Sequence, residues 1–245
     1  GKQDEYGSWL LPPENDLPLQ SLVAAISTRL HKITNDSELL KSLDWFKSRT
    51  EEQNNLEAPI IRKPFFCSGC PHNSSLKVPE GKRALGGIGC HYMAVDSIES
   101  TEFFTQMGGE GTPWIGIAPF SHEKHVFANL GDGTYKHSGI LAIRAALDAS
   151  VNITYKILYN DAVAMTGGQE IGSNWDVEGI VKQVLAEGVK KVSILSEDPK
   201  RYHHLVNNEV KSLHRDTIIT EQEKLSEYEG VSVLIFDQTC AAEKR

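Results

Sequence analysis

The sequence predicts an α/β fold, a doubly wound and mostly parallel sheet that a short helical segment precedes. Apolar runs suited to buried strands recur along the chain and alternate with segments of helical periodicity. The length of 245 residues suits one such domain with an appended segment. We therefore expect a linker and helical segment over residues 1–58 and the α/β domain over residues 59–245.

In the first segment, two amphipathic helices are expected, over residues 19–30 and 36–50. Asn35 or Asp36 can cap the second helix, because a side-chain oxygen there accepts hydrogen bonds from free N–H groups of the first turn. A polar linker is expected over residues 51–58, before the α/β domain begins.

Strands and helices then alternate. The expected strands are 84–88, 125–130, 152–159, 190–196 and 231–237. The expected helices are 138–149, 176–187, 198–206 and one around 220–228. Parallel strands place their carboxyl ends at one edge of the sheet, and such sheets bind ligands there.

The tripeptide Gly131-Asp132-Gly133 follows the strand expected over 125–130. We expect both glycines to let the backbone turn sharply and approach phosphate oxygens closely, which a Cβ atom would prevent. A helix beginning near Ser138 would direct the positive end of its dipole at the same place. The segment therefore predicts a site for a diphosphate group.

Asn160 ends the next expected strand, with 26 residues between it and Gly133. Adjacent parallel strands would bring Asp132 and Asn160 together, and a carboxylate with an amide oxygen suits Mg²⁺. A lone Gly-Asp-Gly is most often an ordinary turn. The added asparagine at this position favours a metal-bound diphosphate instead.

The four cysteines are Cys67, Cys70, Cys90 and Cys240. The first two form a C-x₂-C pair, whose thiolates can face one metal centre. Four thiolates satisfy either a tetrahedral zinc ion or a [4Fe–4S] cluster. Disulfides are a third reading of an even number of cysteines, although no secretory signal is visible.

These motifs resemble those of the pyruvate and 2-oxoacid ferredoxin oxidoreductases. Gly-Asp-Gly, the later Asn160 and the run Thr166-Gly167-Gly168-Gln169 are similar to their thiamine diphosphate fingerprint. The resemblance implies that Mg²⁺ binds Asp132, Asn160 and the carbonyl of Ala162. The implied cofactor-binding residues are Gly131, Asp132, Gly133, Thr134, Asn160, Ala162, Thr166 and Gly167. It also implies one [4Fe–4S] cluster on Cys67, Cys70, Cys90 and Cys240.

Longer stretches, over 104–116, 125–134, 155–169 and 237–245, look like the bacterial single-chain indolepyruvate ferredoxin oxidoreductases. The resemblance implies oxidative decarboxylation of an indolepyruvate or arylpyruvate to an acyl-coenzyme A, with electrons passing through the cluster to ferredoxin. It also implies a homo-oligomer. The chain opens without Met, so we expect one piece of a longer polypeptide. Its pyrimidine-binding domain would hold the activating carboxylate, leaving this piece inactive alone.

The net charge of −8 argues against a nucleic-acid partner, and no apolar run approaches membrane-spanning length. We expect a cytoplasmic protein. Two alternatives stay open: a non-oxidative thiamine enzyme domain with structural zinc, and a degenerate thiamine fold kept for assembly. His72 and His91 flank the cysteines, and we expect them to hydrogen-bond the backbone. Glu110 is a doubtful candidate for the activating carboxylate.

Overall fold

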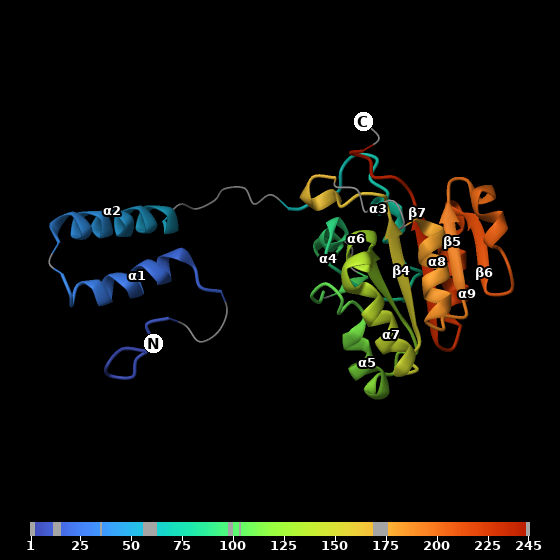
Figure 1. The fold of residues 1–245 in the computed structure, drawn as a ribbon, viewed down its shortest axis with the longest axis horizontal. Helices are drawn as coiled ribbons and strands as arrows, with labels where there is room; N and C mark the ends of the chain where they lie inside the picture. Colours follow the sequence, from blue (N-terminus) through green and yellow to red (C-terminus); the bar gives the residue numbers. More distant parts are fainter. Residues whose placement is uncertain are drawn as a thin grey trace. The chain divides into compact units, whose positions relative to one another are not determined.

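The structure is a computed structural model, which describes residues 3–11, 16–34, 36–55, 63–97, 100–102, 104–168 and 176–243. The chain divides into two compact units, Gly1–Arg62 and Lys63–Arg245 (Figure 1). Over the ranges that are described, no helix combines the length and the apolar character that crossing a bilayer requires.

The first unit contains the two expected helices, α1 (Leu19–Leu30) and α2 (Ser37–Asn54). Asp36 caps α2 by accepting hydrogen bonds from two N–H groups of the first turn. The expected end of this helix at Thr50 is wrong by four residues, because the Glu-Glu-Gln run that follows is a good helix former. The alternative cap, Asn35, lies outside the described residues.

The second unit is built on a seven-stranded sheet in the order β2-β1-β3-β4-β7-β5-β6, and every neighbouring pair is parallel. The strands are β1 (Ala84–Leu85), β2 (Thr101–Glu102), β3 (Val126–Gly131), β4 (Ile153–Tyr159), β5 (Val192–Ser196), β6 (Val210–His214) and β7 (Val231–Asp237). The predicted α/β class is confirmed.

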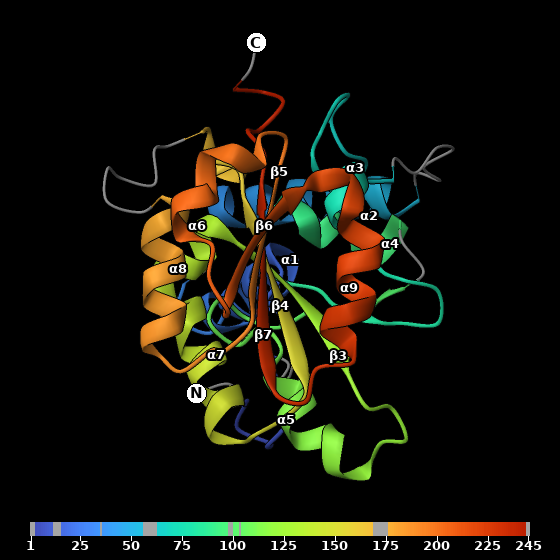
Figure 2. The same cartoon turned by 90° about the vertical axis from the view of Figure 1, so that its right-hand side faces the viewer.

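Helices cover both faces of the sheet (Figure 2). One face carries α7 (Ile140–Asp148) and α8 (Val177–Ala186), which pack on the larger apolar core. The other face carries α9 (Ile218–Ser226). The smaller core on this face also includes Leu76, which follows α3 (His72–Ser75), and Ala94, the first residue of α4 (Ala94–Ser97).

The sheet differs from the expectation in two ways. The first strand is two residues long, because Gly86 and Gly87 follow it directly. The edge strands β2 and β6 are additional, because short or partly exposed edge strands lack a continuous apolar run that would predict them. The helix expected over 198–206 is present as a 3₁₀ helix, Pro199–Leu205.

The helix after Gly-Asp-Gly begins six residues before its expected start at Ser138. It runs from α6 (Asp132–Thr134) through a π-helical turn (Tyr135–Gly139) into α7. The π turn inserts an extra residue, so the apolar spacing of α7 does not continue backward at the helical period. As a result the N-terminus of the helical run lies at Asp132 itself.

Candidate functional site

A cavity of about 370 Å³ lies at the carboxyl ends of β3 and β4. Six of the expected cofactor residues line it, namely Gly131, Asp132, Gly133, Thr134, Asn160 and Ala162. Gly167, with φ of 111°, is not among the lining residues. Thr166 ends a short 3₁₀ helix, Ala164–Thr166, and its side chain is outside the described part, as is all of Gln169.

Asp132 ties the ends of the two central strands together. Its Oδ2 atom accepts hydrogen bonds from the N–H groups of Asn160 and Asp161, at 2.8 and 3.0 Å. Its Oδ1 atom accepts one from the N–H of Gly133 at 2.8 Å. The Asn160 side-chain oxygen accepts a hydrogen bond from the N–H of Ala162 at 3.1 Å. The oxygens are therefore fixed in place by the backbone.

The electrostatics at Asp132 suit a bound cation. Burial raises the pKa of its carboxyl to about 6, although three backbone hydrogen bonds act in the opposite direction. A divalent ion would compensate the buried charge, and the Oδ1 atom of Asp132 and the side-chain oxygen of Asn160, which each accept one backbone hydrogen bond, keep a lone pair for it. Carboxylate, amide and carbonyl oxygens are ligands that Mg²⁺ accepts. The donor set therefore fits the ion that the sequence predicts.

The sharp turn expected at the two glycines does not require glycine in this structure. Gly131 has φ of −70°, and neither it nor Gly133 is in the left-handed region. A Cβ atom at Gly131 would lie 3.1 Å from His91, and one at Gly133 would lie 3.3 Å from Val163. Both glycines thus allow close packing of the cavity walls.

His72 and His91 line the cavity, and the expectation that both hydrogen-bond the backbone is wrong. The Nδ1 atom of His72 lies 3.3 Å from the hydroxyl of Ser75, and Nε2 of His91 has no partner among the described residues. Burial lowers the pKa of His72 to about 4 and that of His91 to about 3. Both imidazoles are therefore neutral at pH 7.

A second cavity, of about 90 Å³, is lined by all four cysteines. Cys67 and Cys70 lie in a tight turn in which the N–H of Cys70 donates to the carbonyl of Cys67, and Gly69 has φ of 75°. Cys90 begins a 3₁₀ helix, Cys90–Met93, rather than ending a strand as expected. Cys240 follows β7. The four thiols come from three separate segments of the chain.

The two cavities share a wall made of His72, Cys90, Asn160 and Ala164. Cys240, which lines only the cysteine cavity, is linked to this wall by a hydrogen bond of 3.2 Å from its N–H to the carbonyl of Asn160. Asn160 thus lines both cavities, and its carbonyl accepts a hydrogen bond from a residue of the second.

None of the four cysteines forms a disulfide in this structure. Burial raises the thiol pKa of Cys70 and of Cys90, and the neighbouring sulfurs add to this effect. Among the described residues, no three His, Cys, Asp or Glu side chains are grouped to hold a single metal ion. In a [4Fe–4S] cluster each thiolate binds a different iron, so the thiolates need to surround a cavity rather than meet at one point.

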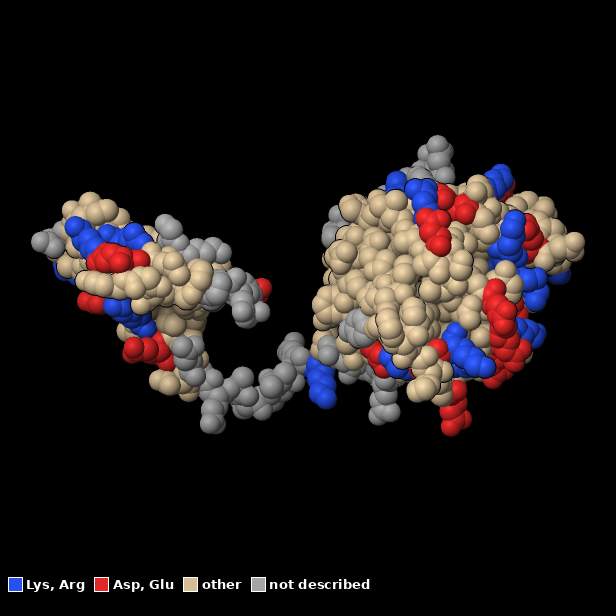
Figure 3. All heavy atoms as spheres, turned by 90° about the horizontal axis from the view of Figure 1, so that it is seen from below, with Lys and Arg blue, Asp and Glu red and all other residues tan. Residues whose placement is uncertain are grey.

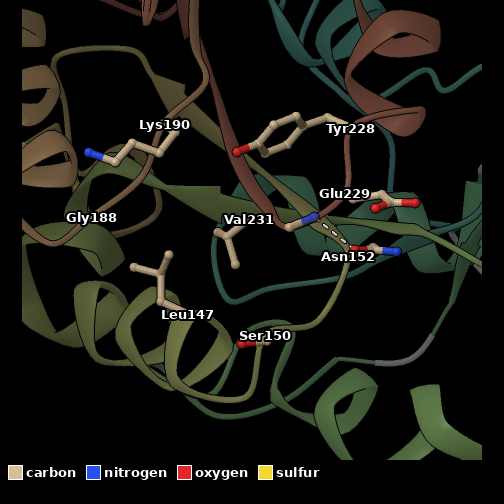
Figure 4. A pocket seen from close by; sticks show the side chains of 9 residues that line it. Leu147, Ser150, Asn152, Gly188, Lys190, Tyr228, Glu229 and Val231 are labelled. Carbon is tan, nitrogen blue, oxygen red and sulfur yellow. Dashed lines mark hydrogen bonds between the residues drawn. The ribbon is translucent and has the colours of Figure 1, made fainter.

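Another cavity, of about 440 Å³, lies at the amino ends of β4 and β7 (Figure 4). Asn152, one of its polar residues, has structural partners: its side-chain oxygen accepts a hydrogen bond from the N–H of Gly230, and its carbonyl accepts one from the Trp114 indole. Trp114 is a buried core residue, whereas Met165 lines the cofactor cavity.

Comparisons with known proteins agree with this geometry. The family model described as "Thiamine pyrophosphate enzyme, C-terminal TPP binding domain" matches residues 87–195. Indolepyruvate oxidoreductase subunit IorA of Thermococcus kodakarensis is 28% identical over 207 residues, covering 75% of this chain and 30% of that protein. IorA of Archaeoglobus fulgidus is 28% identical over 199 residues, covering 74% and 29%. The chain thus spans about three-tenths of these relatives.

Among solved structures, 2-oxoglutarate:ferredoxin oxidoreductase from Magnetococcus marinus has the same fold. The TM-score is 0.52 at 20% sequence identity, covering 76% of this chain and 67% of that one. The matched family residues include β3, β4 and the whole segment from Gly131 to Ala162. Residues 87–195 are therefore similar to the C-terminal thiamine pyrophosphate-binding domain of thiamine pyrophosphate enzymes, and most of the chain is similar to part of the IorA subunits.

Proposed function

We propose that this chain holds thiamine diphosphate through Mg²⁺ in an enzyme that oxidises a 2-oxoacid, an indolepyruvate or another arylpyruvate. Electrons would pass through a [4Fe–4S] cluster on the four cysteines to ferredoxin, and the acyl group to coenzyme A. One observation carries the proposal: the cavity with Asp132 and Asn160 and the cavity with four thiols share a wall.

In this proposal Asp132, Asn160 and the Ala162 carbonyl bind the ion, while Gly131, Gly133 and Thr134 line the diphosphate. Thr166 and Gly167 remain proposed contacts from the sequence fingerprint. The helical run that begins at Asp132 supports this, because the positive end of its dipole would favour the negative charge of a diphosphate bound there. When bound, thiamine diphosphate supplies the nucleophile and the electron sink that decarboxylation of a 2-oxoacid needs.

The cysteine cavity supports the electron-transfer part of the proposal, because Cys90 lines both cavities. A cluster there would be separated from the cofactor by side chains of one wall. The relatives are longer than this chain, in keeping with further domains on the same polypeptide. Those domains would supply the pyrimidine-binding half, the activating carboxylate and a homo-oligomeric interface. A cytoplasmic location belongs to the proposal, since reduced thiols persist there.

The test is calorimetric titration of the chain with thiamine diphosphate, with Mg²⁺ and after its removal by a chelator. Binding that requires Mg²⁺ is expected. In the assembled enzyme, an indolepyruvate should reduce ferredoxin only when coenzyme A is present. Mg²⁺-independent binding would refute the proposed metal site. Release of an aldehyde without ferredoxin reduction, from protein containing zinc, would favour the non-oxidative alternative.

A further inference from the structure

Glu110 is a carboxyl group that the proposed function does not use. Its side chain is fully buried, at 0% exposure, in the glycine-rich loop over residues 104–111. No lysine or arginine pairs with it in the described part of the chain, and burial raises its pKa. Burying a carboxyl group is unfavourable, so its retention at this place calls for a role.

The first contact of Glu110 holds its own loop. Its Oε2 atom accepts a hydrogen bond of 2.8 Å from the N–H of Gly108, two residues earlier. Gly108 has φ of 90°, and a Cβ atom there would lie 2.5 Å from the hydroxyl oxygen of Ser138. The loop is therefore strongly bent and tightly packed where Glu110 ties it. The residue immediately before the bend, Met107, lines the cofactor cavity.

The Glu110 carboxyl also lies beside other residues that line the same cavity. The backbone of Ile88, one of the lining residues, lowers the pKa of this carboxyl. Glu110 also approaches Gly87, where a Cβ atom would lie 3.1 Å from Cγ of Glu110 and 2.9 Å from Nε2 of His91, another lining residue.

We propose that Glu110 is a positioning residue, whose carboxyl group holds the bend at Gly108, and with it Met107, in place at the cofactor cavity. It acts on the cofactor through Met107 and makes no contact with it. The identity of the ligand, thiamine diphosphate, rests on the proposed function. The role of Glu110 in holding the loop does not depend on that function.

The experiment compares Glu110→Gln with Glu110→Met in the full chain. The amide oxygen of glutamine can accept the Gly108 hydrogen bond, whereas methionine fills the same space and cannot. We expect the Gly108 amide to exchange its hydrogen at least tenfold faster in Glu110→Met and within threefold of wild type in Glu110→Gln. The Kd for thiamine diphosphate, with Mg²⁺ saturating, should rise at least tenfold in Glu110→Met alone.

Glu221 supplies the matched control. It is also a buried glutamate, at 1% exposure, but it bonds to Ser193 on β5, and neither residue lines the cofactor cavity. Glu221→Met should lower the unfolding temperature and leave cofactor affinity unchanged. If Glu110→Met fails to fold, Gly108→Ala disturbs the same bend from the Ser138 side and should weaken binding equally.

Unchanged exchange at Gly108 in Glu110→Met would overturn the inference, as would wild-type cofactor affinity in a variant whose loop exchanges faster. A wild-type chain that binds no cofactor would refute the proposed function instead. The exchange measurement on the free protein would then still decide whether Glu110 positions the loop.

Discussion

The cofactor cavity and the cysteine cavity differ in how their ligand atoms are held. In the first, Asp132 and Asn160 have their oxygens fixed by backbone N–H groups. In the second, burial raises the thiol pKa of Cys70 and Cys90, and the thiolate form is therefore disfavoured. The first cavity is preorganised, whereas the second needs its metal to stabilise the ligand form.

The largest effect is expected when the cysteine cavity loses one ligand. Anaerobic reconstitution with iron and sulfide should give about four irons per wild-type chain, and Cys240→Ser should lose or destabilise the cluster. Ser68→Ala, between Cys67 and Cys70, is the control and should keep the iron content of wild type. Iron and acid-labile sulfide analysis, with electron paramagnetic resonance of the reduced form, measures this. A full cluster in Cys240→Ser would disprove the four-cysteine assignment.

The next effect concerns the preorganised cavity. Asp132→Ala removes the anionic ligand and the link between strand ends, so Mg²⁺-dependent affinity for thiamine diphosphate should fall by at least ~100-fold. The neighbouring carboxylate offers a control, because Asp161→Asn retains the backbone N–H that bonds to Asp132. That variant should stay within about twofold of wild type. Calorimetry with equal losses in both variants would argue against a specific ligand at Asp132.

The next prediction concerns Lys156, a buried residue near His72 of the shared wall. Its amine is completely buried, donates to the carbonyl of Lys77 at 3.0 Å, and lowers the pKa of His72. Burial lowers the pKa of Lys156 itself from 10.5 to about 7. Between pH 7 and about 10 the unfolded chain therefore binds more protons, and the free energy of unfolding should rise with pH.

Lys156→Met should remove this rise, which is on the order of a few kcal/mol in total. Gln222 still satisfies the Lys77 carbonyl, at 3.0 Å, in the variant. Urea unfolding at several pH values measures the difference, and the exposed Lys124→Met serves as the control. A wild-type stability that falls from pH 7 to 9 in parallel with that of Lys156→Met would contradict the assignment.

The smallest effect should follow removal of residues 1–62. Both cavities are lined only by residues of the second unit as far as the chain is described. The fragment 63–245 should therefore retain cofactor affinity within about twofold, since distant and independent regions contribute additively. Calorimetry on the two chains makes the comparison. A large loss would place part of the binding site in the helical unit.

Sequence reasoning anticipated the central strands and most of the ligand set. β4 and β7 are mostly apolar runs, so both could be predicted as strands. Because the carboxyl ends of parallel strands meet at one edge, Asp132, Asn160 and Cys240 could be predicted to lie near one another. The single-chain organisation stays a prediction, since the relatives are named as subunits. The proposed boundary between residues 58 and 59 also stays a prediction.

Other features depend on tertiary contacts and could not be foreseen. The π turn before α7 changes the helical period, and the role of Gly131 depends on His91, which is distant in sequence. The shared wall includes His72 and Ala164, and neither residue type indicates from the sequence that it would line both cavities. On the face shown in Figure 3, acidic and basic side chains are interspersed, in agreement with the modest net charge of −8.

The most direct measurement is a crystal structure of the chain grown anaerobically with thiamine diphosphate and Mg²⁺. The account predicts an ion at about 2.1 Å from the Asp132 carboxylate, the Asn160 side-chain oxygen and the Ala162 carbonyl, bridging to the diphosphate. It also predicts that the four cysteines surround one cluster across the wall formed by Cys90. A cofactor bound at the opposite edge of the sheet, beside Asn152 and Tyr228, would contradict it.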